Sequence, residues 1–400
     1  MRKLLQKVLF LLLMGAAALP AVGQPYLIDG SARQRILASI EQGDTRAREL
    51  YARLMRNADK VMPLENPTIT TKGVTPPSGD KHDYISLARY WWPNPDTPDG
   101  LPYVRRDGES NPELKKYDRD CMSTFASRLS ILTGAYLLSE NPDYGRKIAS
   151  ILRTWFLDKK TKMNPNANYA QMVPGRNNGM GNPTGVLDTY SLIHAVDAAL
   201  IMEEAGYLSK KECMALREWF RAYVEWLTTS PNGIGEYEAK NNHGVAYDVQ
   251  TTHFALYTGN EELVARLIGG FAERRLKPQI MEDGSQPLEL ARTTAFGYSV
   301  YNLTHLLDMC YLGRHYGIDL YPAANHAIDR AIQFLIPYLG NQSSFPYKQI
   351  KNWSKVEQDF AQQLLRAYNL CKNEEYLALY KRYRSPEEQK NAQFILFNEY

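Results

Sequence analysis

Helical hydrophobic periodicity runs through almost the whole chain, whereas the period-two alternation of a half-buried strand is nearly absent. In 129–137, 215–227 and 303–311 the apolar side chains recur three or four residues apart and form single stripes. Such a stripe is the core-facing side of an amphipathic helix. The chain is therefore expected to be all-α.

Further helices are predicted between short polar connections. They cover 32–56, 143–157, 185–205, 245–258, 260–276, 323–338, 355–371 and 386–398. Connections such as SPNG at 230–233 and Gly259-Asn260 carry residues that end helices and turn the chain. A long series of helices joined in this way stacks as hairpins, in an open solenoid or in a closed α/α toroid.

The closed form is the better interpretation, because no fixed-length repeat of a regular solenoid is visible. No Ser/Gly-rich or charge-block linker divides the chain, so 24–400 is expected to form one domain. The expected fold is thus a single-domain α/α toroid. Its central cleft would be lined by helix N-termini and by the loops before them.

The first 23 residues have the order of a cleavable signal peptide, with a basic start, an apolar run over 8–19 and small residues at 21–23. The apolar run is shorter than the roughly 20 residues that span a bilayer. No cysteine lies near the expected cut, and no later segment looks apolar enough to cross a membrane. We therefore expect a soluble, monomeric protein without a membrane anchor, either periplasmic or secreted.

Charge and cysteine content exclude several classes of protein. The chain has 47 basic and 44 acidic side chains, and loss of Arg2, Lys3 and Lys7 with the signal peptide leaves 44 of each. This balance argues against nucleic-acid binding, which needs a broad basic face, but it allows a local basic groove for a polyanion. The four widely spaced cysteines indicate neither a zinc site nor a disulfide frame, and we expect core thiols and no metal or other cofactor.

Three polar, glycine-containing segments interrupt the helices. They are 82–112, 174–179, and the pair formed by 240–244 with 292–298. Long non-helical insertions in a compact domain are more often functional than idle. These segments are therefore the first places to look for chemistry.

Their residues suit the cleavage of a uronic-acid polymer by elimination. That reaction removes the C5 proton beside a carboxylate and expels the glycosidic O4. The carboxylate must be neutralised by amide or cationic donors, each worth roughly 3 to 4 kcal/mol by analogy with an oxyanion hole. A base must take the proton, and an acid must protonate O4.

Asn242 and His243 combine an amide and an imidazole just before a helix expected to start near Gly244. The helix N-terminus adds positive potential, and a neutral histidine is a suitable base near neutral pH. Arg292 and Tyr298 can converge if 293–297 is a loop, and the tyrosine could then protonate O4. Alternatively, the first pair is a capping turn and the second consists of unrelated surface residues.

Other polar and aromatic residues are candidates for sugar binding. These are Arg176, Asn177 and Asn178 in a glycine-bounded loop, His194 on a helix, and the aromatic pair Tyr90 and Trp91. Arginine and asparagine can hydrogen-bond a sugar carboxylate or hydroxyl, and aromatic rings can stack on a sugar. A plain turn, a core histidine and buried aromatic packing are the respective structural alternatives.

At this point the sequence resembles a known family. The blocks YISLARYWWPNP at 84–95 and DGLPYVRRDG at 99–108, together with Asn242-His243 and 292–298, are similar to alginate-lyase-domain proteins. The similarity is to polysaccharide lyase family 38 and, more distantly, to family 5. It spans 84–302, which is most of the chain after the signal peptide.

The resemblance implies an α/α toroid that cleaves alginate by metal-independent β-elimination. Carried over residue by residue, Asn242 with Arg292 would neutralise the carboxylate, His243 would be the base and Tyr298 the acid. Arg176, Asn177, Asn178 and His194 would line the sugar subsites.

Three rival functions remain open. A glucuronan or other polyuronate lyase differs only in its substrate. An unsaturated-uronyl glycoside hydrolase would use two acids such as Asp188 and Asp248. A non-catalytic glycan-binding protein would share the helical, aromatic-rich character, although such outer-membrane binders usually carry a lipobox cysteine.

Overall fold

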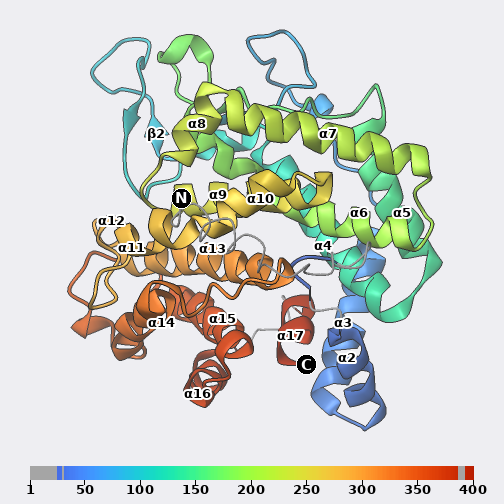
Figure 1. Cartoon of the computed structure of the whole chain (residues 1–400). Coiled ribbons are helices and arrows are strands. Elements are labelled where there is room, and N and C mark those ends of the chain that lie inside the picture. The colour runs from blue at the N-terminus through green and yellow to red at the C-terminus, as the bar shows by residue number, and fades with distance from the viewer. Residues whose placement is uncertain (1–24, 29–30, 386–391) are drawn as a thin grey trace, which may run out of the picture.

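Helices dominate the computed structural model, which describes residues 25–28, 31–385 and 392–400 (Figure 1). The α-helices are α2 (Ala32–Glu41), α3 (Thr45–Val61), α4 (Arg119–Ser139), α5 (Pro142–Leu152), α6 (Ile193–Glu204), α7 (Lys210–Thr229), α8 (Pro231–Tyr237), α9 (Asn242–Thr258), α10 (Glu261–Gly269), α11 (Lys277–Gln279), α12 (Pro287–Leu290), α13 (Ala295–His315), α14 (Ala323–Leu335), α15 (Trp353–Cys371), α16 (Glu374–Tyr383) and α17 (Ala392–Glu399). The expected signal peptide lies outside the described residues.

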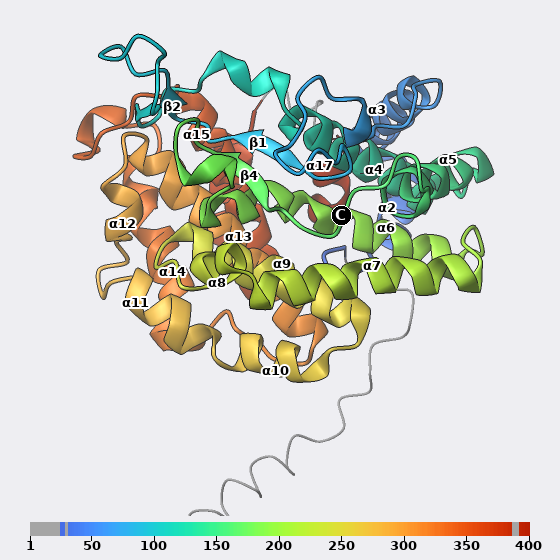
Figure 2. The same ribbon diagram turned by 90° about the horizontal axis from the view of Figure 1, so that it is seen from above.

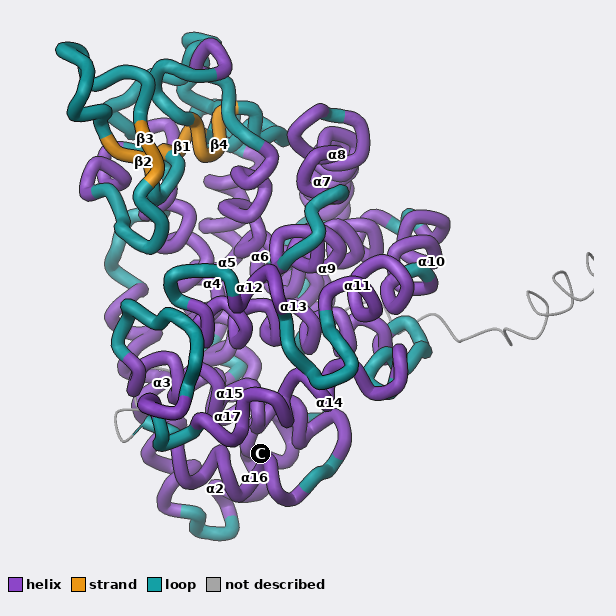
Figure 3. Tube along the Cα trace, turned by 90° about the vertical axis from the view of Figure 1, so that its left-hand side faces the viewer, coloured by secondary structure: helices purple, strands orange, loops and turns teal. Residues whose placement is uncertain are grey.

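Short helical turns and strands complete the fold. They are η1 (Ile69–Thr71), η2 (Pro112–Lys116), η3 (Arg153–Leu157), η4 (Asn177–Gly179), η5 (Pro183–Leu192), η6 (Ala272–Leu276), η7 (Ile336–Tyr338), η8 (Gln342–Ser344), β1 (Ile85–Leu87), β2 (Trp91–Trp92), β3 (Val104–Arg105) and β4 (Tyr169–Met172). Strand β1 pairs with β4 in parallel, and β2 pairs with β3 antiparallel. Figure 3 shows that all four strands lie at one end of the helical body, among long loops.

The long helices pack against one another as the periodicity predicts. Helix α9 contacts α7, α10 and α13, and α13 contacts α14 and α15. Seen from above, α7, α10 and α14 lie around α9 and α13 (Figure 2). The expected class, an all-α fold of the α/α-toroid type, is confirmed.

Aromatic side chains form much of the core between α4, η3 and α7. Phe125 stacks on Trp155 with ring centroids 4.1 Å apart, and Phe156 meets Trp219 edge to face at 4.7 Å. All four rings are buried. Burial of such a side chain contributes about 1.5 to 3 kcal/mol to the free energy of unfolding. The cluster therefore stabilises the packing of α4 and α7 against η3.

Helix boundaries differ from expectation at particular capping residues. The predicted helix 32–56 is two helices, because Gly43 takes a positive φ of 93° and Asp44 caps α3 through the Ala47 amide. Ser230 ends α7, as predicted, but it also accepts a hydrogen bond from the Gly233 amide and begins α8, so a second helix starts where only a turn was expected at 230–233. Serine, proline and glycine occur both where one helix ends and where the next begins, so these residue types alone do not place a helix boundary.

One helical stretch is apolar and long enough to cross a membrane by composition alone. It runs from Asn177 to Glu204, and 78% of its most apolar window is buried inside the protein. The expectation that no segment after the signal has such a composition is therefore wrong. Burial of this kind is what the core helix of a soluble protein shows.

All four cysteines are free thiols in the structure. Cys213 and Cys310 are buried, as expected of core residues, whereas Cys121 and Cys371 are only partly buried. Burial raises the pKa of the Cys121 thiol to about 12, which keeps it protonated near neutral pH.

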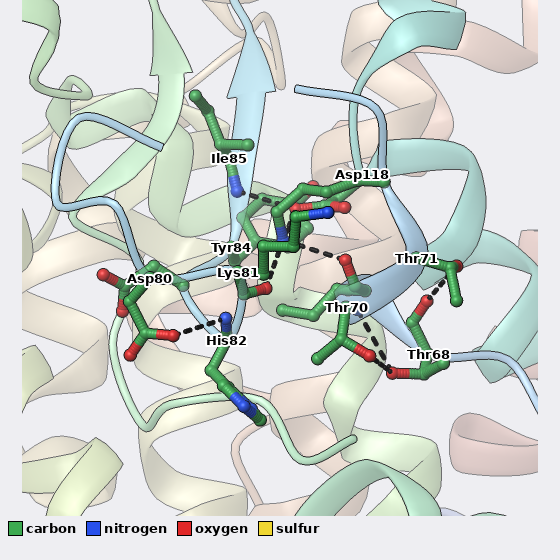
Figure 4. A network of polar contacts seen from close by, with 12 residues as sticks. Thr68, Thr70, Thr71, Asp80, Lys81, His82, Tyr84, Ile85 and Asp118 are labelled. Carbon is green, nitrogen blue, oxygen red and sulfur yellow. Dashed lines mark hydrogen bonds and ion pairs between the residues drawn. The ribbon is translucent and has the colours of Figure 1, made fainter. Parts of the chain in front are cut away.

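A buried ion pair fixes strand β1 to the start of α4. The Lys72 ammonium donates to the Asp118 carboxylate at 2.9 Å and to the carbonyl oxygens of Ile69 and Lys81 at 2.9 and 2.7 Å. Asp118 also accepts from the Ile85 amide at 3.0 Å, and the network surrounds the start of β1 (Figure 4). Strand β1 leads directly into the loops at the strand-bearing end of the body.

We predict that Lys72→Met lowers the free energy of unfolding by about 3 to 5 kcal/mol, because it leaves a buried carboxylate without its partner. Denaturant unfolding at neutral pH measures the loss. The control is Lys116→Met. The Lys116 side chain is 63% exposed in its pair with Glu113, so this substitution should leave the denaturation midpoint nearly unchanged. Equal effects of the two substitutions would contradict the assigned role of Lys72.

Candidate active site

Helix α9 begins where the predicted amide and imidazole stand. Asn241 caps the helix, so Asn242 and His243 occupy its first turn. A Cβ atom at Gly244 would lie 2.2 Å from the Ala239 carbonyl oxygen and 2.5 Å from Arg275 Nη1. Only glycine therefore allows the start of α9 to pack this closely on the segment before it.

His243 is held by a carboxylate behind it. Its Nδ1 lies 2.6 Å from Glu236 Oε1, and the Glu236 side chain is almost fully buried. Because a carboxylate accepts, Nδ1 carries the proton and Nε2 keeps its lone pair. Burial lowers the pKa of His243, but the Glu236 carboxylate outweighs it, and the pKa lies above its ordinary value.

Asn242 faces a second buried carboxylate. Its backbone amide and its side-chain Nδ2 donate to the two oxygens of Glu289, at 2.7 and 2.8 Å. The Asn242 side chain is fully buried, and its Oδ1 has no hydrogen-bond partner among the described residues. Burial raises the pKa of Glu289, and the Asn242 donors, His243 and Arg292 oppose that rise.

Arg292 and Tyr298 converge, but not through the loop that the sequence suggested. Helix α13 starts at Ala295, so Gly297 and Tyr298 are helical and only the residues before 295 form the bend. Arg292 Nη2 donates to the Tyr298 hydroxyl at 2.8 Å, and its guanidinium carbon lies 3.8 Å from the ring centroid. Tyr90 contributes a second hydroxyl, 3.1 Å from that of Tyr298.

The charge of Arg292 acts both on Tyr298 beside it and on His243 at the start of α9. The Arg292 cation lowers the pKa of both His243 and Tyr298, in each case as a smaller effect than burial. Burial keeps the pKa of Tyr298 above its ordinary value, so the phenol is protonated near neutral pH. A base with a free lone pair and a protonated hydroxyl beside a guanidinium are the groups that an elimination needs.

The loop residues named as sugar-binding candidates lie at the strand-bearing end. The Arg176 guanidinium stacks over the Trp91 ring at 4.8 Å, and Asn177 Nδ2 donates to Asn182 at 2.9 Å. Asn178 takes a positive φ of 51° and is exposed. This arrangement brings Trp91 and Arg176 together and leaves the side chains of 176–178 open to solvent.

His194 is placed apart from this group. It lies on α6, and its electrostatic neighbours are Asp197, His253 and Asp308. Burial lowers the pKa of His194, so the imidazole is neutral near pH 7. Within the part of the chain that the structure describes, no hydrogen bond, ion pair or ring contact joins it to His243 or Tyr298.

Sequence reasoning missed several site residues. Glu236, Glu289 and Asp107 each hold a predicted residue, and nothing in their local sequence marks them for that role. Tyr301 and His305 were detectable, because 298, 301 and 305 share one face of a helix. Tyr301 is 37% exposed, and its ring lies 4.5 Å from that of His305.

Among the described residues, no three His, Cys, Asp or Glu side chains are arranged to hold a metal ion. Arginine, histidine, asparagine and tyrosine are the polar groups that the site presents. Burial and the neighbouring charged groups, among them Glu236, Glu289 and Asp107, set the pKa values of these side chains.

Known proteins resemble this chain over most of its length. The model of the alginate lyase family matches residues 68–345. A crystallised alginate lyase from Bacteroides ovatus is 41% identical, with a TM-score of 0.88, over 94% of this chain and 99% of that one. No curated protein matches.

More distant structures share the fold. Alginate lyase A1-III from Sphingomonas species A1 is 18% identical, with a TM-score of 0.60, over 90% of this chain and 92% of that one. A histidine-to-alanine variant of A1-III complexed with a tetrasaccharide is 18% identical to this chain, with a TM-score of 0.59. The match covers 88% of this chain and 90% of that one. With the family match and the 41% identity above, the conclusion is that this chain belongs to the alginate lyase family.

Proposed function

We propose that the protein cleaves alginate by β-elimination and leaves a 4,5-unsaturated uronate at the new chain end. The observation that carries the proposal is that the Arg292 cation acts on the pKa of both His243, whose Nε2 makes no hydrogen bond to a described residue, and Tyr298, whose phenol accepts a hydrogen bond from Arg292. Family membership and the Bacteroides ovatus enzyme, described as an alginate lyase, support the substrate. Placement in polysaccharide lyase family 38 is part of the proposal.

The reaction removes the C5 proton, forms the C4=C5 double bond, breaks the C4–O4 bond and protonates O4. Arg292 is the proposed cation for the substrate carboxylate, because its Nη1 makes no hydrogen bond among the described residues. Asn242 is proposed to assist through the second N–H of its side-chain amide, since Glu289 takes the other. Neutralising the carboxylate stabilises the charge that develops when C5 loses its proton.

Mannuronate and guluronate present the C5 proton on opposite faces relative to O4. For mannuronate, Tyr298 is proposed to act alone in a syn elimination. Its phenolate form, stabilised by the Arg292 cation, takes the C5 proton, and the resulting phenol returns that proton to O4 as the C4–O4 bond breaks. For guluronate, His243 takes the proton and Tyr298 donates to O4 from the opposite side, an anti elimination. The presence of two proton carriers supports this division.

The rival hydrolase mechanism is poorly supported by its two candidate acids. Asp188 is fully buried, forms an ion pair with Arg119 and accepts hydrogen bonds from Tyr84 and Gln171. Asp248 is fully buried between Arg274 and Arg275. Carboxylates with their oxygens occupied in this way are not available to protonate a glycosidic oxygen.

The site of action is a further part of the proposal. The basic, apolar and small-residue order of the first 23 residues supports export, followed by action of residues 24–400 as one soluble domain in the periplasm or outside the cell. The tetrasaccharide complexed with the A1-III variant supports an oligosaccharide or polysaccharide as the ligand, and the family supports alginate, which is anionic.

Tyr298→Phe is expected to lower kcat on every susceptible polymer by about 10²- to 10⁴-fold, because it removes the proton donor to O4. The rise in ultraviolet absorbance from the new C4=C5 bond measures the rate on mannuronate-rich alginate, guluronate-rich alginate and glucuronan. The wild-type rate should survive a chelator. Faster cleavage of glucuronan than of either alginate would reassign the substrate, and no rise on any polymer would refute the lyase.

His243→Ala is expected to abolish cleavage of guluronate blocks and to spare most of the activity on mannuronate blocks, where Tyr298 alone carries the proton. Initial rates on the two block polymers provide the comparison, with Tyr298→Phe as the variant that loses both. An equal loss on both polymers would show that the division of labour is wrong.

The fall in activity at low pH should report the pKa of His243, because the imidazole must be neutral to act as a base. Its raised pKa means that guluronate cleavage falls as the pH drops through a value above about 6.5. Glu236→Gln removes the carboxylate that raises the pKa, so the fall should move to lower pH. The measurement is kcat/KM on guluronate blocks against pH, and a fall that does not move would exclude Glu236 as the cause.

A further inference from the structure

We infer that Asp107 is a positioning residue for this reaction, which fixes the Arg292 guanidinium against the Tyr298 hydroxyl. The inference rests on the proposed function. Asp107 belongs to the segment that follows β3, far from both partners in sequence. Its role would be to set the orientation of the cation that donates a hydrogen bond to the proposed proton donor.

The carboxylate of Asp107 grips Arg292 with both oxygens. Oδ1 accepts from Arg292 Nη2 at 2.7 Å, and Oδ2 accepts from Nε at 3.3 Å. Oδ2 also accepts from the Thr293 amide at 3.3 Å and from its hydroxyl at 3.0 Å. Burial raises the pKa of Asp107, but Arg292 and Thr293 outweigh it and hold the pKa well below its ordinary value.

The hydrogen bonds to Asp107 determine which N–H groups of Arg292 remain for other partners. One N–H of Arg292 Nη2 goes to Asp107, and the other goes to the Tyr298 hydroxyl at 2.8 Å. The two N–H groups of Nη1 make no hydrogen bond to a described residue, so they remain for a substrate carboxylate. A bidentate pair fixes the plane of the guanidinium, which a long arginine side chain does not do alone.

Backbone packing and hydrogen bonding on either side of Asp107 fix its position. Gly108 has a positive φ of 82°, and a Cβ there would lie 2.6 Å from Thr293 Oγ1 and 2.7 Å from Ile350 Cδ1. The Arg106 amide donates to the Tyr90 carbonyl at 2.7 Å. One hairpin thus delivers Tyr90 to the Tyr298 hydroxyl and Asp107 to Arg292.

Asp107→Asn tests the inference because it keeps the shape and removes the charge and one strong acceptor. We expect kcat on the preferred alginate to fall by about 10- to 100-fold, as for a misplaced catalytic group, with KM changed less than about threefold. The matched control is Arg105→Gln. Arg105 is 53% exposed and donates to the same Asp107 oxygen at 2.7 Å, so its loss should leave kcat near the wild-type value.

A double-mutant cycle separates positioning from simple docking of the hairpin. If Asp107 acts through Arg292, Asp107→Asn should cost little more in an Arg292→Ala background, and the two losses are not additive. Thr293→Val removes a docking hydrogen bond without touching Arg292 and should retain most of kcat. Melting temperatures report folding, and Asp107→Ser serves for the same cycle if Asp107→Asn does not fold.

Two outcomes would overturn the inference while wild-type activity persists. One is wild-type kcat in Asp107→Asn, and the other is a loss that adds fully to that of Arg292→Ala. A wild-type protein with no elimination activity on any polyuronate would instead refute the proposed function.

Discussion

The rest of the site depends on the hydrogen bonds that the Arg292 guanidinium makes to Asp107 and Tyr298. It lies between α12 and α13, donates to the Tyr298 hydroxyl and is clamped by Asp107 from the segment after β3. Its charge also reaches His243 at the start of α9. The guanidinium therefore joins two stretches of chain that are more than a hundred residues apart, and it acts electrostatically on a third. The Arg292 charge lowers the pKa of the proposed acid and, as a smaller effect than burial and Glu236, that of the proposed base.

Carboxylates set the properties of the groups proposed to do chemistry. Glu236 fixes the His243 tautomer, Glu289 occupies the Asn242 amide, and Asp107 orients Arg292. Each carboxylate accepts a hydrogen bond from the group that it holds, and another nitrogen or N–H of that group remains for the substrate. A buried charge without a partner costs several kcal/mol, which makes each pair mutually stabilising and explains why the site can be rigid before substrate arrives. The charge that develops on the substrate then meets oriented donors.

Much of the fold could be predicted because helix formation is a local property. The stripe from Trp219 to Leu227 is buried along α7, and most predicted helices are found within a few residues. Boundaries were less accurate where one residue type has two uses. Ser230 ends α7, as predicted, but also begins α8 where only a turn was expected, and Gly297 lies inside α13 although glycine suggested a loop. In both cases packing of the flanking helices decided between two locally acceptable conformations.

The sequence by itself determined the fold class, the position of Asn242 and His243 at a helix start, and the nomination of Arg292 and Tyr298, because spacing and residue chemistry are written along the chain. Only the tertiary structure decided which carboxylate each of these residues meets, because the contacts of Glu236, Glu289 and Asp107 depend on how helices and loops pack. It also separated His194 from the group around Tyr298. Electrostatic environment is a property of position in space, which sequence order does not encode when the interacting residues are far apart.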